Sequence, residues 1–144
     1  MSAAEIVRPE GWPRGAGYAD GVVARGRVLA VAGQIGWDPA TQTFATDDMG
    51  EQAARALENV VAVLRAAGAG PEHVVRLTWY VTDRGAYVAA RRRIGEAYRA
   101  TFGRHYPAMS VVIVAGLLEE RALVEIEATA VIPDGPPVRT ASEA

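Results

Sequence analysis

The sequence predicts a single α+β domain, residues 1–144, in which two helices pack on one face of a mixed β-sheet. A chain of 144 residues is enough for one domain. Its apolar residues follow the periods of strands and helices in the order β-β-α-β-α-β-β. Two amphipathic helices cannot cover both faces of the sheet that this order implies. We therefore expect the uncovered face to pack against another copy of the chain.

The first elements are predicted from glycines and short apolar runs. Residues 1–16 are rich in Gly and Pro, and we expect them to form an irregular lead-in. Two apolar runs, residues 18–24 and 28–33, flank Gly26. This pattern predicts a β-hairpin with Gly26 in its turn.

One apolar stripe at helical spacing predicts a helix over residues 48–67. Asp47 or Asp48 is expected to cap this helix, and Asp48, with Glu51 three residues later, is typical of a helix N-terminus. Gly68 and Pro71 mark the end of the helix. The stripe consists of Ala53, Leu57, Val60, Val61 and Leu64.

The second half of the chain alternates strands with one further helix. Residues 74–82 are enriched in β-branched and aromatic side chains, which favours a strand. An aromatic and apolar stripe predicts a helix over residues 86–102. Strands are predicted over residues 110–114 and 123–131, the latter from strict alternation. Residues 133–144 are polar and Pro-rich, and we expect a flexible tail.

The composition excludes several kinds of chemistry. All 15 basic residues are arginine, so a lysine Schiff base and a P-loop are excluded. Cysteine is absent, which excludes a thiolate nucleophile, and the two histidines are too few for a histidine-built metal site. We therefore expect no metal site built from cysteine or histidine. The net charge of −2 offers no basic face for nucleic acid.

No targeting pattern is visible in the sequence. The N-terminus lacks a basic segment followed by an apolar one, which a secretory signal requires. No apolar run reaches the roughly 18 residues of a membrane span. We therefore expect no membrane association and a cytoplasmic location.

Five segments stand out by residue type and spacing. They are residues 31–35 with Asp38 and Pro39; Gln52, Asn59 and residues 64–69; residues 74–83; residues 106–110; and residues 124–128. No single segment is specific to one protein family, but the five segments in this order and at this spacing are. Together they resemble the RidA (YjgF-type) family, whose best-known members are deaminases of reactive imines and enamines. The resemblance covers about residues 17–132.

The resemblance implies a chorismate-mutase-like fold and a homotrimer. It also implies a small-molecule substrate bound in clefts at the subunit interfaces, without a cofactor or a metal. In deaminating members a tyrosine and a glycine backbone hold the ligand, and a glutamate of the last strand activates water. The matching residues are Tyr18, Gly33 and Glu125. Tyr18 and Glu125 are thus our catalytic candidates, and Gly33 is a substrate-binding candidate.

The sequence departs from the family at the residue that grips the substrate. The family motif is Pro-Ala-Arg-Ser, and its arginine holds the carboxylate of a short 2-imino acid. Residues 107–110 read Pro-Ala-Met-Ser instead. We expect Met109 and Ser110 to contact a different substrate, because a thioether suits an apolar or aromatic ligand. Arg91, on the apolar stripe of the second helix, is our candidate for the missing anion contact.

Each candidate also has a purely structural interpretation. Glu125 would then be a solvated strand residue, as we expect for Glu127. Tyr18 would cover a sheet edge, and Gly33 would form a bulge. Met109 would fill a site that has lost its activity.

The leading functional hypothesis is a cofactor-independent enzyme that hydrolyses a reactive imine or enamine and releases ammonia. The alternative is a non-catalytic trimer that binds a small molecule or regulates a protein partner. A ribonuclease is a weaker third hypothesis, because the acidic balance provides no groove that tracks phosphates.

Overall fold

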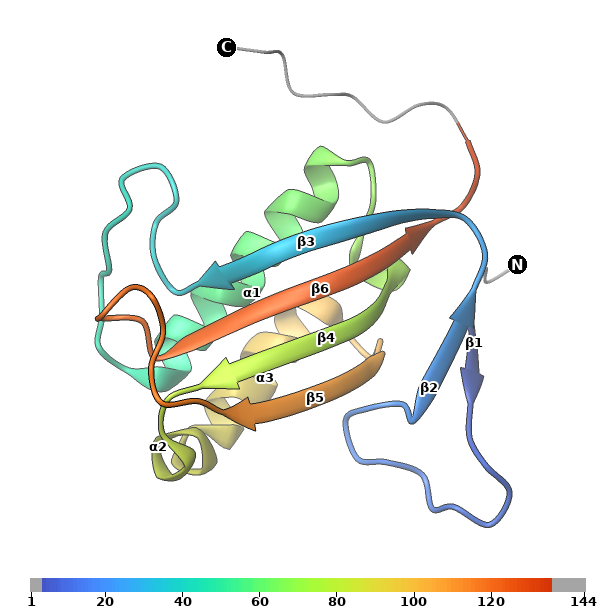
Figure 1. Ribbon diagram of the computed structural model, residues 1–144, viewed down its shortest axis with the longest axis horizontal. Coiled ribbons are helices and arrows are strands. Elements are labelled where there is room, and N and C mark those ends of the chain that lie inside the picture. Colours follow the sequence, from blue (N-terminus) through green and yellow to red (C-terminus); the bar gives the residue numbers. More distant parts are fainter. Residues whose placement is uncertain (1–3, 136–144) are drawn as a thin grey trace.

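The computed structural model describes residues 4–135, and a four-stranded mixed sheet lies at its centre (Figure 1). The elements are, in order, β1 (Ala4–Val7), β2 (Gly21–Ala24), β3 (Arg27–Ile35), α1 (Met49–Ala66), a 3-10 turn (Pro71–His73), β4 (Val74–Val81), α2 (Arg84–Ala89), α3 (Arg91–Phe102), β5 (Ala108–Ile113) and β6 (Val124–Ile132). Strand β6 lies between β3 and β4 and is antiparallel to both. Strand β5 is parallel to β4, and the segment α2–α3 makes the crossover that a parallel pair requires.

The helices α1 and α3 lie on the same face of this sheet (Figure 1). Strand β6 shows why, because its residues alternate between buried and half-buried along its whole length. Val124, Ile126 and Ala128 point toward the helices and pack with Leu57 and Trp79 in one apolar core. The α+β class, the mixed sheet and the helices on one face are confirmed.

The predicted hairpin around Gly26 is wrong. Strand β2 pairs with β1, with Ala24 opposite Ala4, and β3 pairs with β6 instead. Gly26 has φ +149°, and a Cβ there would lie 2.8 Å from the carbonyl carbon of Ile132. The chain thus leaves one sheet and enters another at Gly26. The residues beside Gly26 do not reveal that the flanking strands belong to different sheets. Which strands pair depends on packing with segments that are distant in the chain.

Both ends of the described chain bear on the sequence prediction. The lead-in of residues 1–16 is not wholly irregular, since β1 occupies Ala4–Val7. Strand β2 provides hydrogen-bond partners for the backbone along one edge of β1. Composition alone does not reveal this pairing. Of the predicted tail, residues 136–144 lie outside the described residues.

The second long helix is interrupted, which contradicts the single helix predicted over residues 86–102. Asp83 caps α2 by accepting a hydrogen bond from the backbone N–H of Ala86 at 2.6 Å. The chain then changes direction at Ala90, whose φ and ψ are −88° and 0°. Arg91 therefore begins a new helix rather than continuing an old one.

Two buried amide side chains fix the loops around α1. Gln52 donates to the carbonyls of Thr46 and Arg121, each at 3.0 Å, and accepts from the backbone N–H of Leu123 at 2.8 Å. Asn59 donates to the carbonyls of Ile35 and Trp37 at 3.0 and 2.9 Å. Both amides are almost completely buried, so these bonds are shielded from water.

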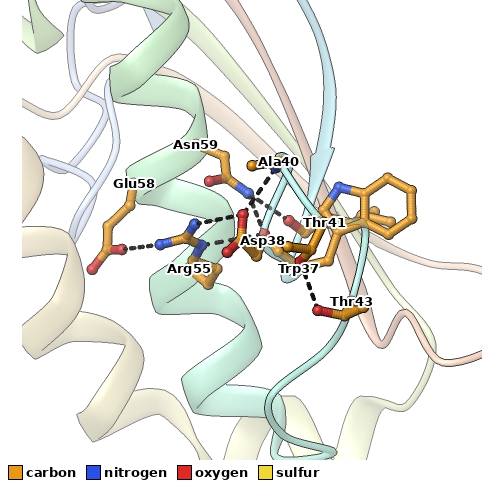
Figure 2. Close-up of polar contacts among 9 residues, drawn as sticks. Trp37, Asp38, Ala40, Thr41, Thr43, Arg55, Glu58 and Asn59 are labelled. Carbon is orange, nitrogen blue, oxygen red and sulfur yellow. Dashed lines mark hydrogen bonds and ion pairs between the residues drawn. The ribbon is translucent and has the colours of Figure 1, made fainter.

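Charged side chains complete the attachment of the loop that follows β3 (Figure 2). Arg55 lies between Asp38 and Glu58, at 3.8 and 3.4 Å from their carboxylates, and its Nε donates to the Trp37 carbonyl at 3.2 Å. Asp48 caps α1 as the sequence predicts, by accepting from the N–H of Glu51 at 2.9 Å. The end of β3 is thus attached to the helix face at several points.

We predict that Asn59→Ala lowers the free energy of unfolding by about 2–3 kcal/mol. The change removes a buried donor from the Ile35 carbonyl and one of two donors from the Trp37 carbonyl. Chemical denaturation at fixed protein concentration measures the loss. Glu58→Ala is the control, because an exposed ion pair contributes about 0–1 kcal/mol. Equal losses in the two variants would contradict the role given to Asn59.

Candidate active site

Glu125 and Gly33 meet on the face of the sheet opposite the helices. Glu125 lies on β6 between two buried residues and points away from the core. The β3–β6 register shifts between Val31 and Gln34, so Gly33 sits in a bulge. A Cβ on Gly33 would lie only 2.7 Å from the carboxyl carbon of Glu125. The absence of a side chain at residue 33 therefore lets the carboxylate lie against the backbone.

The carboxylate of Glu125 has no hydrogen bond or ion pair with any residue in the part of the chain that the structure describes. It is half-buried, so it is not a fully solvated strand residue either. A half-buried carboxylate without a hydrogen-bond or ion-pair partner is able to accept a proton from a water molecule. Its geometry thus fits the role that the family resemblance implies.

Glu127, two residues along the same strand, is in a different situation. The hydroxyl of Tyr80 donates to its Oε1 at 2.7 Å, although Tyr80 lies directly opposite Glu125 in the register. This hydrogen bond, with burial and the charges of both glutamates, raises the pKa of Tyr80 above 10.0. The expectation that Glu127 is merely solvated is therefore wrong. Of the two carboxylates on this face, Glu125 is the unpaired one.

Met109 and Arg91 meet on the other side of the sheet. Met109 is opposite Leu77 in the β4–β5 register, and both point toward the helices. A cavity of about 370 Å³ lies there between β5, α2 and α3. Its wall includes Trp79, Tyr87, Arg91, Arg99, Tyr106 and Met109. The structure thus brings the substituted motif residue and the candidate anion contact into one cavity.

Tyr18 and Ser110 lie elsewhere. Tyr18 is 45% exposed and lines a neighbouring cavity of about 490 Å³, which shares Gly17 and Tyr106 with the first. Ser110 follows Met109 on the strand and points to the opposite face, where it is paired with Thr78. Ser110 is therefore on the same face as Glu127, not in the Met109 cavity.

In one chain the sheet separates the two halves of the candidate site. Glu125 and Gly33 lie on the face without helices, and Arg91 and Met109 lie on the face with helices. Sequence reasoning missed Trp79, Tyr87 and Tyr106 as cavity residues. Each was interpreted as part of a strand, a helix stripe or a motif. The aromatic side chain of Trp79 within a strand was a signal for burial, but not for a cavity.

A further cavity of about 420 Å³ lies beside the loop of Figure 2, between α1 and α3. Its charged residues are paired with one another. Arg55 contacts Asp38 and Glu58, and Arg93 contacts Glu51 at 2.7 Å. These pairs attach the loop and the helices, so we assign this cavity no ligand.

In residues 4–135 no group of acidic, histidine or cysteine side chains is arranged to hold a metal, and no helix has the length and apolarity to span a bilayer.

Comparison with known proteins decides the family. The sequence profile of the family described as endoribonuclease L-PSP matches residues 13–132. The chain belongs to this family, which is the RidA (YjgF) family.

RidA-family relatives match most of the chain. A 2-iminobutanoate/2-iminopropanoate deaminase of Salmonella typhimurium is 37% identical over 117 residues, covering 79% of this chain and 86% of the relative. A RutC family protein of Pyrococcus horikoshii is 33% identical over 126 residues, covering 88% and 96%. The crystal structure of a Rid family protein of unknown function from Yersinia pestis has a TM-score of 0.78 and 32% identity, covering 90% of this chain and 99% of that one. The RidA family thus contains named deaminases and proteins of unknown function.

We predict that Glu127→Ala lowers the pKa of Tyr80 toward the usual value. The neutral hydroxyl is the donor, so its bond stabilises the fold below pH 10.0 and this contribution is lost as pH rises through the raised pKa. Ultraviolet absorbance of tyrosinate, with Tyr80→Phe subtracted, measures the shift. Glu125→Gln should change this titration less, because Glu125 makes no hydrogen bond to the phenol. An unchanged titration in Glu127→Ala would refute the pairing.

Proposed function

We propose that this RidA-family protein hydrolyses a reactive imine or enamine to a carbonyl compound and ammonia. The observation that carries the proposal is the unpaired, half-buried carboxylate of Glu125 against the backbone of Gly33. Relatives named as 2-iminobutanoate/2-iminopropanoate deaminases support it.

The reaction needs one base and one water molecule. Glu125 accepts a proton from water while the water oxygen bonds to the imine carbon, and this proton passes to the nitrogen, which gives a carbinolamine. The carboxylate then takes the hydroxyl proton of the carbinolamine and passes it to the nitrogen. The carbon–oxygen double bond forms as the carbon–nitrogen bond breaks, and ammonia leaves with the bonding pair. The products are one carbonyl compound and one ammonia, so no oxidant, reductant or cofactor is needed. Positioned proton transfer of this kind contributes about 10²–10⁴-fold to a rate.

The substrate of this protein differs from the short 2-imino acids of the family. Met109 stands where the family motif has a carboxylate-binding arginine, and a thioether cannot form the two parallel hydrogen bonds of an arginine–carboxylate pair. Arg91 lines the same cavity as Met109 and is exposed, so it is able to take over the anion contact. Tyr18 would close the site from the neighbouring cavity, with Tyr106 between them.

A homotrimer is part of the proposal. The sheet separates Glu125 from Arg91 within a chain, so a site that contains both needs two copies. Val28 and Val112 are 71% and 40% exposed on the face without helices, which supports contact between copies there. Each cleft would then combine Glu125 and Gly33 of one copy with Arg91 and Met109 of the next.

A non-catalytic binding protein is the second candidate. The replacement of the motif arginine by Met109 favours it, because a cavity can keep its shape after its activity is lost. Ammonia release from a panel of enzymatically generated imines distinguishes the two. A ligand that binds without any ammonia release from the panel would favour the binding protein.

We predict that Glu125→Gln lowers turnover by about 10²–10⁴-fold, because it keeps the shape of the side chain and removes the base. Ammonia release under substrate saturation measures the effect. Glu127→Gln is the matched control on the same strand face, since its amide oxygen still accepts from Tyr80. Turnover that is unchanged in Glu125→Gln would remove Glu125 from the mechanism.

We predict a mass in solution of about three times the 15.3 kDa chain mass. Light scattering at micromolar concentration measures it. Mixing Glu125→Gln with Arg91→Ala after dissociation should then restore part of the activity, because some interfaces combine the two intact halves. A monomer, or no recovery in mixed trimers, would contradict a site shared between copies.

A further inference from the structure

The cavity around Met109 contains a buried hydrogen-bond donor without an acceptor. Trp79 is 2% exposed and forms part of the cavity wall. Its indole Nε1–H finds no partner among residues 4–135. Buried polar groups in folded proteins are almost always paired, so an isolated one in a cavity wall calls for a missing acceptor. That acceptor would belong to a molecule in the cavity.

The cavity also carries two positive charges without counter-charges. Arg91 and Arg99 both line it, and neither forms an ion pair within the described part of the chain. Their neighbours Arg92 and Arg93 do form ion pairs, with Glu96 and Glu51. No acidic side chain is among the described residues that line the cavity. The cavity is therefore electrostatically complementary to an anion.

Gly95 gives Arg99 the space to lie along α3. A Cβ on Gly95 would lie 3.3 Å from Nη1 of Arg99. Arg99 is one helical turn after Gly95, and both line the cavity. The guanidinium is thus held over the helix surface beside the cavity, where a planar donor fork suits a carboxylate.

The rest of the wall consists mostly of aromatic and apolar side chains. Tyr98 and Tyr106 stack with their ring centroids 5.4 Å apart and their planes 8° apart. Tyr98 donates its hydroxyl to the His105 carbonyl at 2.6 Å and stacks on Phe102 as well, so it supports Tyr106 and adds no free polar group to the cavity. Met109 adds a polarizable thioether, which makes favourable contacts with aromatic rings.

We propose that this cavity binds an aromatic 2-imino acid, with its carboxylate on Arg91 and Arg99, its ring against Tyr106 and Met109, and an acceptor atom on the indole N–H of Trp79. The reaction of this ligand rests on the proposed deaminase function, whereas its binding does not. The hydrolysis product is then the matching aromatic 2-oxo acid, which is stable and serves as a probe.

Binding of phenylpyruvate and 2-oxobutanoate to the intact protein, measured by calorimetry, tests the proposal. Phenylpyruvate should bind at least about tenfold more tightly than 2-oxobutanoate. Arg91→Ala and Arg99→Ala should each weaken phenylpyruvate binding by about tenfold or more, as expected for a charged hydrogen bond. Arg92→Ala is the matched control on the same helix and should leave the affinity unchanged. Met109→Arg should shift the preference toward 2-oxobutanoate, because it replaces the apolar contact of the ring with a donor fork.

The indole N–H of Trp79 provides a second, independent readout. In ¹⁵N-labelled protein the three tryptophans give three indole signals, and Trp79→Phe identifies one of them. That signal should move downfield when phenylpyruvate is added, as a new hydrogen bond forms. Trp79→Phe should weaken phenylpyruvate binding, whereas Trp37→Phe, in the loop of Figure 2, should not. A Trp79 signal that does not respond to saturating phenylpyruvate would overturn its assigned contact.

The outcomes separate this proposal from the proposed function. Equal affinity for the two oxo acids would overturn the aromatic site, and so would a phenylpyruvate affinity that is unchanged in Arg91→Ala and Arg99→Ala. Either result would do so even if the protein releases ammonia from a short imine. Selective phenylpyruvate binding without ammonia release from any aromatic imine would support the site and overturn the deaminase.

Discussion

The structure depends on two buried amides of α1, because they position both sides of the candidate carboxylate site. Asn59 holds the carbonyl of Ile35, two residues after Gly33. Gln52 holds the N–H of Leu123, two residues before Glu125. The bulge of β3 and the start of β6 are thus fixed to the same helix. Such bonds are strong in a dry interior and costly to break, so Gly33 and Glu125 keep their contact without a direct bond between them.

The alternation of side chains along strand β6 gives the two faces of the sheet different roles. Its alternate residues form the core against α1, and the others face away from the helices. On that second face, Tyr80 has two carboxylates within its electrostatic reach but donates its hydrogen bond to Glu127. Glu125 is left unpaired beside the backbone. One tyrosine therefore determines which of the two carboxylates is hydrogen-bonded and which is left without a partner.

The sheet that holds Glu125 also separates it from Arg91 and Met109. The proposed catalytic carboxylate and the proposed anion-binding cavity lie on opposite faces, so the two cannot act on one small molecule within one chain. The proposed assembly of copies would bring the two faces together, and the exposed valines are compatible with it. The cavity itself combines donors, cations and aromatic rings without an acidic residue. These lining residues suit a bound small molecule, although Met109 stands where the family motif has an arginine.

The sequence by itself determined the α+β class, the central elements and the family, because hydrophobic period and motif spacing are local properties. The strand of Glu125 and the cap at Asp48 were predictable for the same reason. The pairing of β2 with β1, the interruption at Ala90 and the bond from Tyr80 to Glu127 were decided only by the tertiary structure. Each depends on partners distant in the chain, whose choice reflects packing and burial rather than local residue preference.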